Sequence, residues 1–184
     1  MSEKIKCALV IGHSIKAQGA VNLRSGISEY QFNKLISPWI VGRINEENID
    51  AVIIERESLK LLPEKINQFN PHFSIEMHCN SSENMLSSGS EVLYWHDSEK
   101  GKVFANILLE SFIECGYRKR GIKPVYFADK GRVYLSKTTC PAIIAEPFFI
   151  NNNDEFEYTY LVLEDLVSAY VKGINLIAEY IKNH

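Results

Sequence analysis

The sequence lacks the features that define several large classes of protein. No apolar run is long enough to span a membrane, the formal charge is only −3, and the four cysteines show no CxxC spacing. These absences predict a protein with no transmembrane segment, no general affinity for nucleic acid and no cysteine-based metal or redox motif. We interpret the cysteines as reduced thiols in or near the core.

No signal peptide is predicted either. The first apolar run, 7–11, is ended at once by Gly12 and His13, which is too early for the core of a secretory signal. We therefore expect synthesis in the cytoplasm. With 184 residues and 46% hydrophobic content, the chain should form one domain over residues 1–184, and we expect a monomer.

Strand-like and helix-like segments alternate along the chain, which predicts a three-layer α/β domain with a twisted, mostly parallel sheet flanked by helices. Ser28 is the expected N-cap of the first helix, and Pro38 should kink or split it. The predicted strands are 5–12, 50–55, 72–79, 90–95 and 142–148, and the predicted helices are 28–47, 57–69, 98–116 and 158–182. The segment 117–137 shows no period and is interpreted as a loop-rich basic rim, with seven basic side chains against one aspartate.

Three of the predicted strands end on a side chain that can bind metal or carry a proton. They lead to His13, His78 and Glu146. Continuous apolar runs of this kind are typical of strands buried on both faces, and open α/β sheets bind ligands beyond the carboxyl ends of their strands. Two imidazoles and a carboxylate should therefore meet at one edge of the sheet.

Glu29 completes a candidate zinc site. Hydrolytic zinc sites often use two histidines and one glutamate, which leaves a fourth position for water. The chain must return after His13 to a helix that begins near Ser28, so Glu29 lies in the first turn over the same edge. Asn33, one turn further on, can support these ligands by hydrogen bonding. Glu146 is then free to act as a general base beside a metal-bound water.

Each residue alone also has an ordinary explanation. Either histidine can be a satisfied polar residue at a strand end, and Glu29 can be a first-turn acid favoured by the helix dipole. Glu146 can pair with the basic rim, and that rim can be a solvated loop. The prediction rests on all four residues falling in the right places together.

In order along the chain, these motifs resemble the zinc-dependent N-acetylmuramoyl-L-alanine amidase family often called amidase 3. The matching segments are Gly12-His13 with Gly19-Ala20, Glu29 with Asn33, Arg56 after the second strand, His78-Cys79-Asn80, Gly89-Ser90-Glu91-Val92, Arg120-Gly121-Ile122-Lys123, and Pro141-Ala142 through Glu146 to Phe149 and Asn152. The resemblance implies that His13, Glu29 and His78 bind zinc, that Glu146 is the catalytic acid/base, and that the substrate is peptidoglycan.

Five further residues are predicted to contact substrate or support the ligands: Asn33, Glu76, Asn80, Arg120 and Lys123. Glu76 departs from the family, which usually has serine two residues before the second histidine. It lies on the same strand face as His78, so it can either support the zinc ligands or pair with a Lys or Arg at the cleft wall. Ser14-Ile15 and Pro147-Phe148 are the other departures, each at a position where the family commonly has glycine.

The resemblance implies hydrolysis of the amide between the lactyl group of N-acetylmuramic acid and L-alanine. Two other functions fit the same residues: a zinc carboxypeptidase or related peptidase that acts on the stem peptide, and a wall-binding module without activity. Only 68 residues separate His78 from Glu146, which leaves no room for an inhibitory helical insertion. We therefore expect a constitutively active, phage-type endolysin that reaches the cell wall after release across the membrane, with an exported host autolysin as the alternative.

Overall fold

The computed structural model describes residues 4–46 and 49–184. Its strands are β1 (Ile5–Ile11), β2 (Ile49–Glu55), β3 (Phe73–Met77), β4 (Ser90–Trp95), β5 (Lys119–Val125) and β6 (Ala142–Glu146). Its helices are α1 (Glu29–Glu46), α2 (Leu62–Phe69), α3 (Glu99–Glu114), α4 (Arg132–Lys137), α5 (Asn153–Leu161) and α6 (Leu163–Asn183). Among these residues, no helix combines the length and the hydropathy needed to cross a bilayer.

The six strands form one mostly parallel sheet in the order β2-β1-β3-β6-β4-β5. β1 is parallel to β2 and β3, and β3 is parallel to β6. β4 runs antiparallel to β6 and pairs in parallel with the edge strand β5. The carboxyl ends of β1, β3 and β6 therefore lie at one edge, and the pair Glu91↔Glu146 brings the start of β4 to the same edge.

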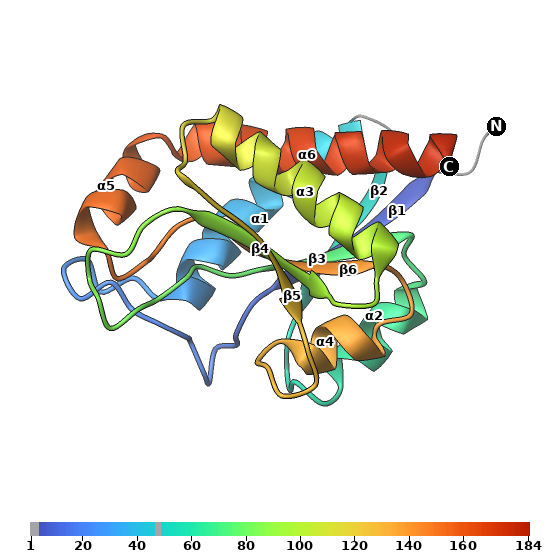
Figure 1. Cartoon of the computed structure of the whole chain (residues 1–184), viewed down its shortest axis with the longest axis horizontal. Helices are drawn as coiled ribbons and strands as arrows, with labels where there is room; N and C mark the ends of the chain where they lie inside the picture. Colours follow the sequence, from blue (N-terminus) through green and yellow to red (C-terminus); the bar gives the residue numbers. More distant parts are fainter. Residues whose placement is uncertain (1–3, 47–48) are drawn as a thin grey trace.

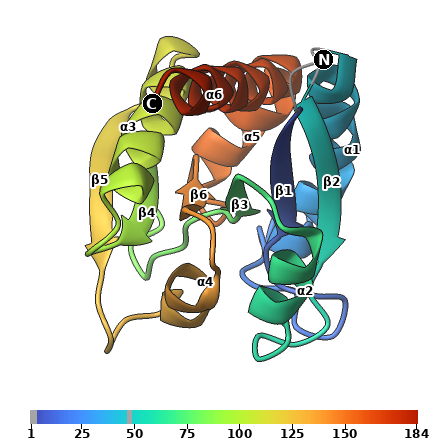
Figure 2. The ribbon, with the colours of Figure 1, turned by 90° about the vertical axis from the view of Figure 1, so that its right-hand side faces the viewer.

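Helices cover both faces of the sheet, as the three-layer prediction required (Figures 1 and 2). Alternation along β1 shows the division: Cys7 and Leu9 belong to the core shared with α1, α3 and α6, while Ala8 and Val10 belong to a smaller core under α2 and α4. Successive residues of a strand point to opposite faces, so a strand covered on both sides must be apolar throughout. This explains the continuous apolar runs of the central strands.

Helix α1 begins as predicted but is not split. Ser28 Oγ accepts a hydrogen bond from the Gln31 backbone N–H at 3.2 Å, and the Ser28 N–H donates to Gln31 Oε1 at 2.9 Å, which is a reciprocal capping box. Pro38 lies inside one uninterrupted helix. Proline deprives the Lys34 carbonyl of its usual partner, and the Ser37 hydroxyl donates to that carbonyl at 3.5 Å. Residue 47, the predicted end of this helix, lies outside the described residues.

Two segments differ from the prediction. The segment 117–137 contains strand β5 and helix α4, so the interpretation as a loop-rich rim is wrong. β5 is an edge strand with mostly exposed side chains, which is why it shows no apolar period. The single helix predicted over 158–182 is two helices, α5 and α6, which are separated at Val162. Asn152 caps α5, because its Oδ1 accepts hydrogen bonds from the Asp154 and Glu155 N–H groups.

Candidate metal and catalytic site

His13 and His78 follow the ends of the adjacent strands β1 and β3. The Gly12 N–H donates to the Met77 carbonyl at 2.9 Å, which keeps the two chains together just beyond the sheet. A Cβ on Gly12 would lie 2.7 Å from His78 Nε2, and a Cβ on Gly19 would lie 2.6 Å from His13 Cδ2. Each imidazole therefore packs directly against a glycine backbone, and Gly19 also has a φ of +81° that favours glycine.

Glu29, in the first turn of α1, faces both imidazoles with the same carboxylate oxygen. Its Oε2 lies 2.9 Å from His13 Nε2 and 3.1 Å from His78 Nδ1. One candidate ligand atom from each of the three residues can be chosen so that all lie within 4.8 Å of one another. Two nitrogen donors and one carboxylate at this spacing match the donor set of a hydrolytic zinc site.

The charges at this cluster favour a cation. Burial alone would raise the pKa of Glu29, but hydrogen bonds from His13 and His78 outweigh it and lower the pKa to about 2. For His78, burial opposes the charged form, yet the negative charges of Glu76 and Glu29 raise its pKa well above the ordinary value. The carboxylates therefore stabilise positive charge at the cluster, whether it is carried by protons or by a metal ion.

Glu146, the last residue of β6, lies in the same cavity. Its Oε2 is buried and has no hydrogen-bond partner among the described residues. Burial raises the pKa of Glu146 to about 8, because the charge of His78 offsets only part of the cost of burying a carboxylate. A buried carboxyl group with an unpartnered oxygen and a pKa near neutrality is suited to accept and return a proton.

This raised pKa predicts a pH-dependent stability. With the metal removed by a chelator, the folded protein binds a proton at Glu146 up to about pH 8, whereas the unfolded chain releases it near the ordinary glutamate pKa of 4.5. Stability from this group is therefore present below pH about 4.5 and is lost as the pH rises to about 8. Glu146→Gln does not titrate, so its free energy of unfolding should exceed that of the wild type by a few kcal/mol more at pH 9 than at pH 5.

Urea unfolding of both proteins at the two pH values checks this expectation. Glu114→Gln, at an exposed ion pair with Lys172, serves as the matched control. A difference between Glu146→Gln and wild type that is the same at pH 5 and pH 9 would show that Glu146 is not a buried, weakly acidic carboxyl group.

One cavity of about 640 Å³ joins these groups. His13, Glu29, His78 and Glu146 all line it. Sequence reasoning did not assign a role to several other lining residues. These are Arg56, Leu59, Leu93, Lys130, Gly131 and Ile144. Two of them had a signal in the sequence: Arg56 as the arginine that follows the second strand, and Lys130 as one of the seven basic side chains in the segment 117–137.

Comparison with known proteins agrees with this geometry. The family model for N-acetylmuramoyl-L-alanine amidase matches residues 7–175 of the chain. The chain belongs to this amidase family. Membership supports amidase activity on peptidoglycan. No curated protein sequence matched the chain significantly.

Solved structures of similar proteins share the fold of this amidase family member. An N-acetylmuramoyl-L-alanine amidase from Clostridium difficile 630 superimposes with a TM-score of 0.88 at 20% identity, over 97% of this chain and 98% of that one. The catalytic domain of the CD27L endolysin, which targets Clostridia difficile, gives 0.80 at 24% identity over 92% and 96%. The catalytic domain of CwlV from Bacillus (Paenibacillus) polymyxa var. colistinus gives 0.80 at 23% identity over 97% and 99%.

Glu76, where this amidase family usually has serine, has two partners. Its Oε1 lies 3.4 Å from His78 Nε2 and 3.4 Å from Arg56 Nη1, and its side chain is 2% exposed. The sequence analysis left two alternatives for Glu76, support of a zinc ligand or pairing with a Lys or Arg. The structure shows both contacts, because the carboxylate lies against the candidate ligand His78 and against Arg56 at the cavity wall. Arg56 compensates the buried charge that the departure from serine introduces.

The expected role of Asn33 needs correction. Its Nδ2 donates to the Met77 carbonyl at 3.0 Å and lies 3.9 Å from Cys79 Sγ. No hydrogen bond to Glu29 or to either imidazole is found among the described residues. Asn33 instead ties α1 to the end of β3, so it holds in place the backbone that precedes His78.

Asn80, Arg120 and Lys123 gather around another carboxylate, Glu91. Asn80 donates to Glu91 Oε1 through Nδ2, Arg120 Nε lies 3.1 Å from Oε2, and Lys123 Nζ lies 4.0 Å from it. Asn80 lines the cavity, whereas Arg120 and Lys123 are not among its lining residues. Their role in substrate binding stays a prediction, and both side chains form ion pairs with Glu91.

Proposed function

We propose that this amidase family member is a zinc-dependent hydrolase that cuts the amide between the lactyl group of N-acetylmuramic acid and L-alanine. The observation that carries the proposal is the convergence of His13, Glu29, His78 and Glu146 in one cavity. The match of the family model over residues 7–175 supports the same activity.

Zinc fits the residues present. His13, Glu29 and His78 would hold it, since their ligand atoms are mutually within 4.8 Å and the ionised Glu29 carboxylate faces both imidazoles. A bound zinc ion supplies a Lewis acid and lowers the pKa of a water molecule to about 7. Glu146 stays outside this set, with a buried oxygen that has no partner among the described residues.

Glu146 carries the proton transfers in the proposed reaction. Its carboxylate accepts a proton from the attacking water and returns that proton to the departing amine of L-alanine. A cation at the neighbouring cluster would lower the pKa of Glu146 from its metal-free value near 8, because positive charge stabilises the carboxylate form. Arg56, whose Nη1 contacts the same Glu76 oxygen as His78 Nε2, limits the negative charge at the cavity wall.

Product analysis tests the proposal against its rivals. We expect digestion of defined muropeptides to release a stem peptide with a free amino group on L-alanine, detected by mass spectrometry. Cleavage within the stem or at its end would instead identify a peptidase. Binding to sacculi without any cleavage, in protein shown to contain zinc, would identify a wall-binding module.

Glu76 is proposed to tune the metal site through His78. Glu76→Ser restores the residue usual in the family but leaves His78 Nε2 and Arg56 without their 3.4 Å partner. Partners of metal ligands commonly change affinity or activity by about 10–100-fold. We expect zinc affinity to fall within this range or the pH optimum to shift, as measured by competition with a chromophoric chelator and by a pH profile.

Glu57→Ser is the matched control, because its side chain is 79% exposed and pairs with Lys65. If Glu76→Ser leaves both the zinc affinity and the pH optimum at the wild-type values, the carboxylate is a tolerated substitution with no influence on the metal.

The proposed site of action is the bacterial cell wall. The likeness to an endolysin catalytic domain supports the endolysin assignment at the level of the fold. Release across the membrane by a phage-type mechanism, constitutive activity and the monomeric state stay predictions.

A further inference from the structure

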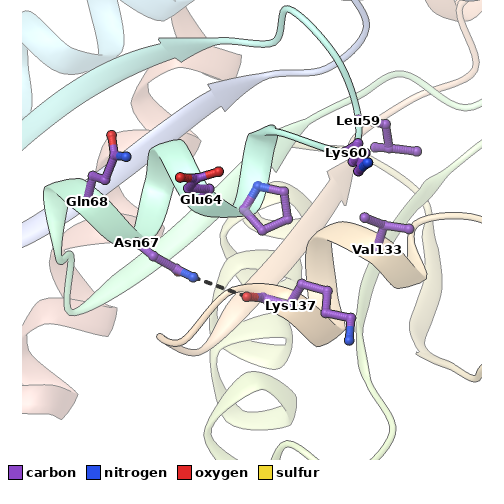
Figure 3. Close-up of a pocket in the computed structure, with 8 residues that line it drawn as sticks. Leu59, Lys60, Glu64, Asn67, Gln68, Val133 and Lys137 are labelled. Atoms are coloured by element: carbon purple, nitrogen blue, oxygen red, sulfur yellow. Dashed lines mark hydrogen bonds between the residues drawn. The ribbon is translucent and has the colours of Figure 1, made fainter.

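A second cavity lies beside the proposed active site. It is a groove of about 890 Å³ between α2 and α4, shown in Figure 3. Leu59, Pro63 and Val133 give it an apolar lining, Lys60 and Lys137 contribute two cations, and Glu64 contributes one carboxylate. None of the family motifs found in the sequence lies in this groove.

The groove and the catalytic cavity share their walls. Leu59 lines both cavities. On one wall the chain continues from Leu59 to Lys60 in the groove, and on the other it passes from Gly131 in the catalytic cavity to Val133 in the groove. A substrate bound at Glu146 can therefore extend between these two walls into the groove.

The dimensions and ends of the groove suit a short extended peptide. Helix α2 has 8 residues and is therefore about 12 Å long, a length that three to four extended residues cover at about 3.3 Å per residue. At the far end, Asn67 connects the two helices, because its Nδ2 donates to the Lys137 carbonyl at 3.2 Å and its Oδ1 accepts from the Thr139 N–H at 2.9 Å. These bonds fix the spacing of α2 and α4 independently of any ligand.

We propose that the α2/α4 groove binds the stem peptide of the substrate, with its C-terminal carboxylate near Lys137. This proposal rests on the proposed amidase function, which places L-alanine at Glu146 and leaves the rest of the peptide to be accommodated. The groove offers apolar surface to the side chains and, one turn further along α4 than Val133, a cation at Lys137.

The experiment compares muramoyl peptides that differ only in stem length. With L-alanine at Glu146, a muramoyl dipeptide leaves one residue for the groove, whereas a muramoyl tetrapeptide leaves three. We expect Lys137→Glu to raise the ratio of the tetrapeptide KM to the dipeptide KM by about tenfold, because charge reversal replaces an attraction by a repulsion. High salt should reduce this effect. Lys102→Glu, at an exposed position on α3 beyond the other face of the sheet, is the control and should keep the wild-type ratio.

A second variant tests the groove without changing its charge. Val133→Trp fills the space beside Leu59 and should raise the same KM ratio, with circular dichroism as the check of folding. Titration calorimetry of the free tetrapeptide into each variant gives a readout that does not depend on turnover. If the wild type fails to release the L-alanine amine from either substrate, the proposed function is wrong. If it cleaves both and neither variant changes the ratio or the peptide affinity, the groove is not the stem-peptide site.

Discussion

Replacing Glu146 by glutamine is expected to lower turnover by about 10²–10⁴-fold, the usual contribution of a general acid–base group. The amide is nearly the same size as the carboxyl group but cannot accept the proton of water or return it to the leaving amine. Because Glu146 contributes no atom to the His13, Glu29 and His78 cluster, the zinc content should stay at one ion per chain.

The kinetic measurement uses a soluble muramoyl peptide, with zinc determined on the same samples. Glu114→Gln, at the exposed ion pair with Lys172 and outside the lining of the catalytic cavity, should retain the wild-type rate. A decrease of less than about tenfold in properly folded, zinc-loaded Glu146→Gln would exclude this residue as the proton carrier. Together with the unfolding data at pH 5 and pH 9, the result connects one property of Glu146, its buried and unpartnered oxygen, to both catalysis and stability.

The part of the site that could be predicted from the sequence is the part built on buried parallel strands. β1, β3 and β6 are covered on both faces, so their apolar runs are continuous and their ends are marked by polar residues. Glu29 was accessible to the same reasoning, because the chain after His13 must return to the helix that begins at Glu29. Local sequence was sufficient wherever burial on both faces set the pattern.

The remaining features depend on pairings between distant segments. β5 forms because Lys119–Val125 adds to the edge of β4, and exposed edge residues such as Lys123 carry no apolar period. The contact of Glu76 with Arg56 requires the register of β3 relative to the end of β2, which a single sequence does not contain. The groove between α2 and α4 also depends on two segments that are distant in the sequence. In addition, α4 has only 6 residues, which is too short for its apolar pattern to indicate a helix.

Loss of any one candidate ligand is expected to remove zinc from the protein. His13→Ala, Glu29→Ala and His78→Ala each leave only two of the three donors that fit the metal. Because residues that merely support ligands change metal affinity by about 10–100-fold, removal of a ligand itself should exceed that range. Activity on muramoyl peptides should fall with the zinc content, since the chemistry proposed for Glu146 needs the water that the metal activates.

The three variants should also differ in how they respond to the loss of charge. Glu29→Ala removes the carboxylate that faces both imidazoles, so the pKa of His78 should fall, and an NMR titration of the histidine ring protons in chelator-treated protein measures it. His96→Ala, at a histidine outside the cluster, should keep both zinc and activity. Full zinc content in any one of the three variants would remove that residue from the ligand set, and full content in all three would place the metal elsewhere.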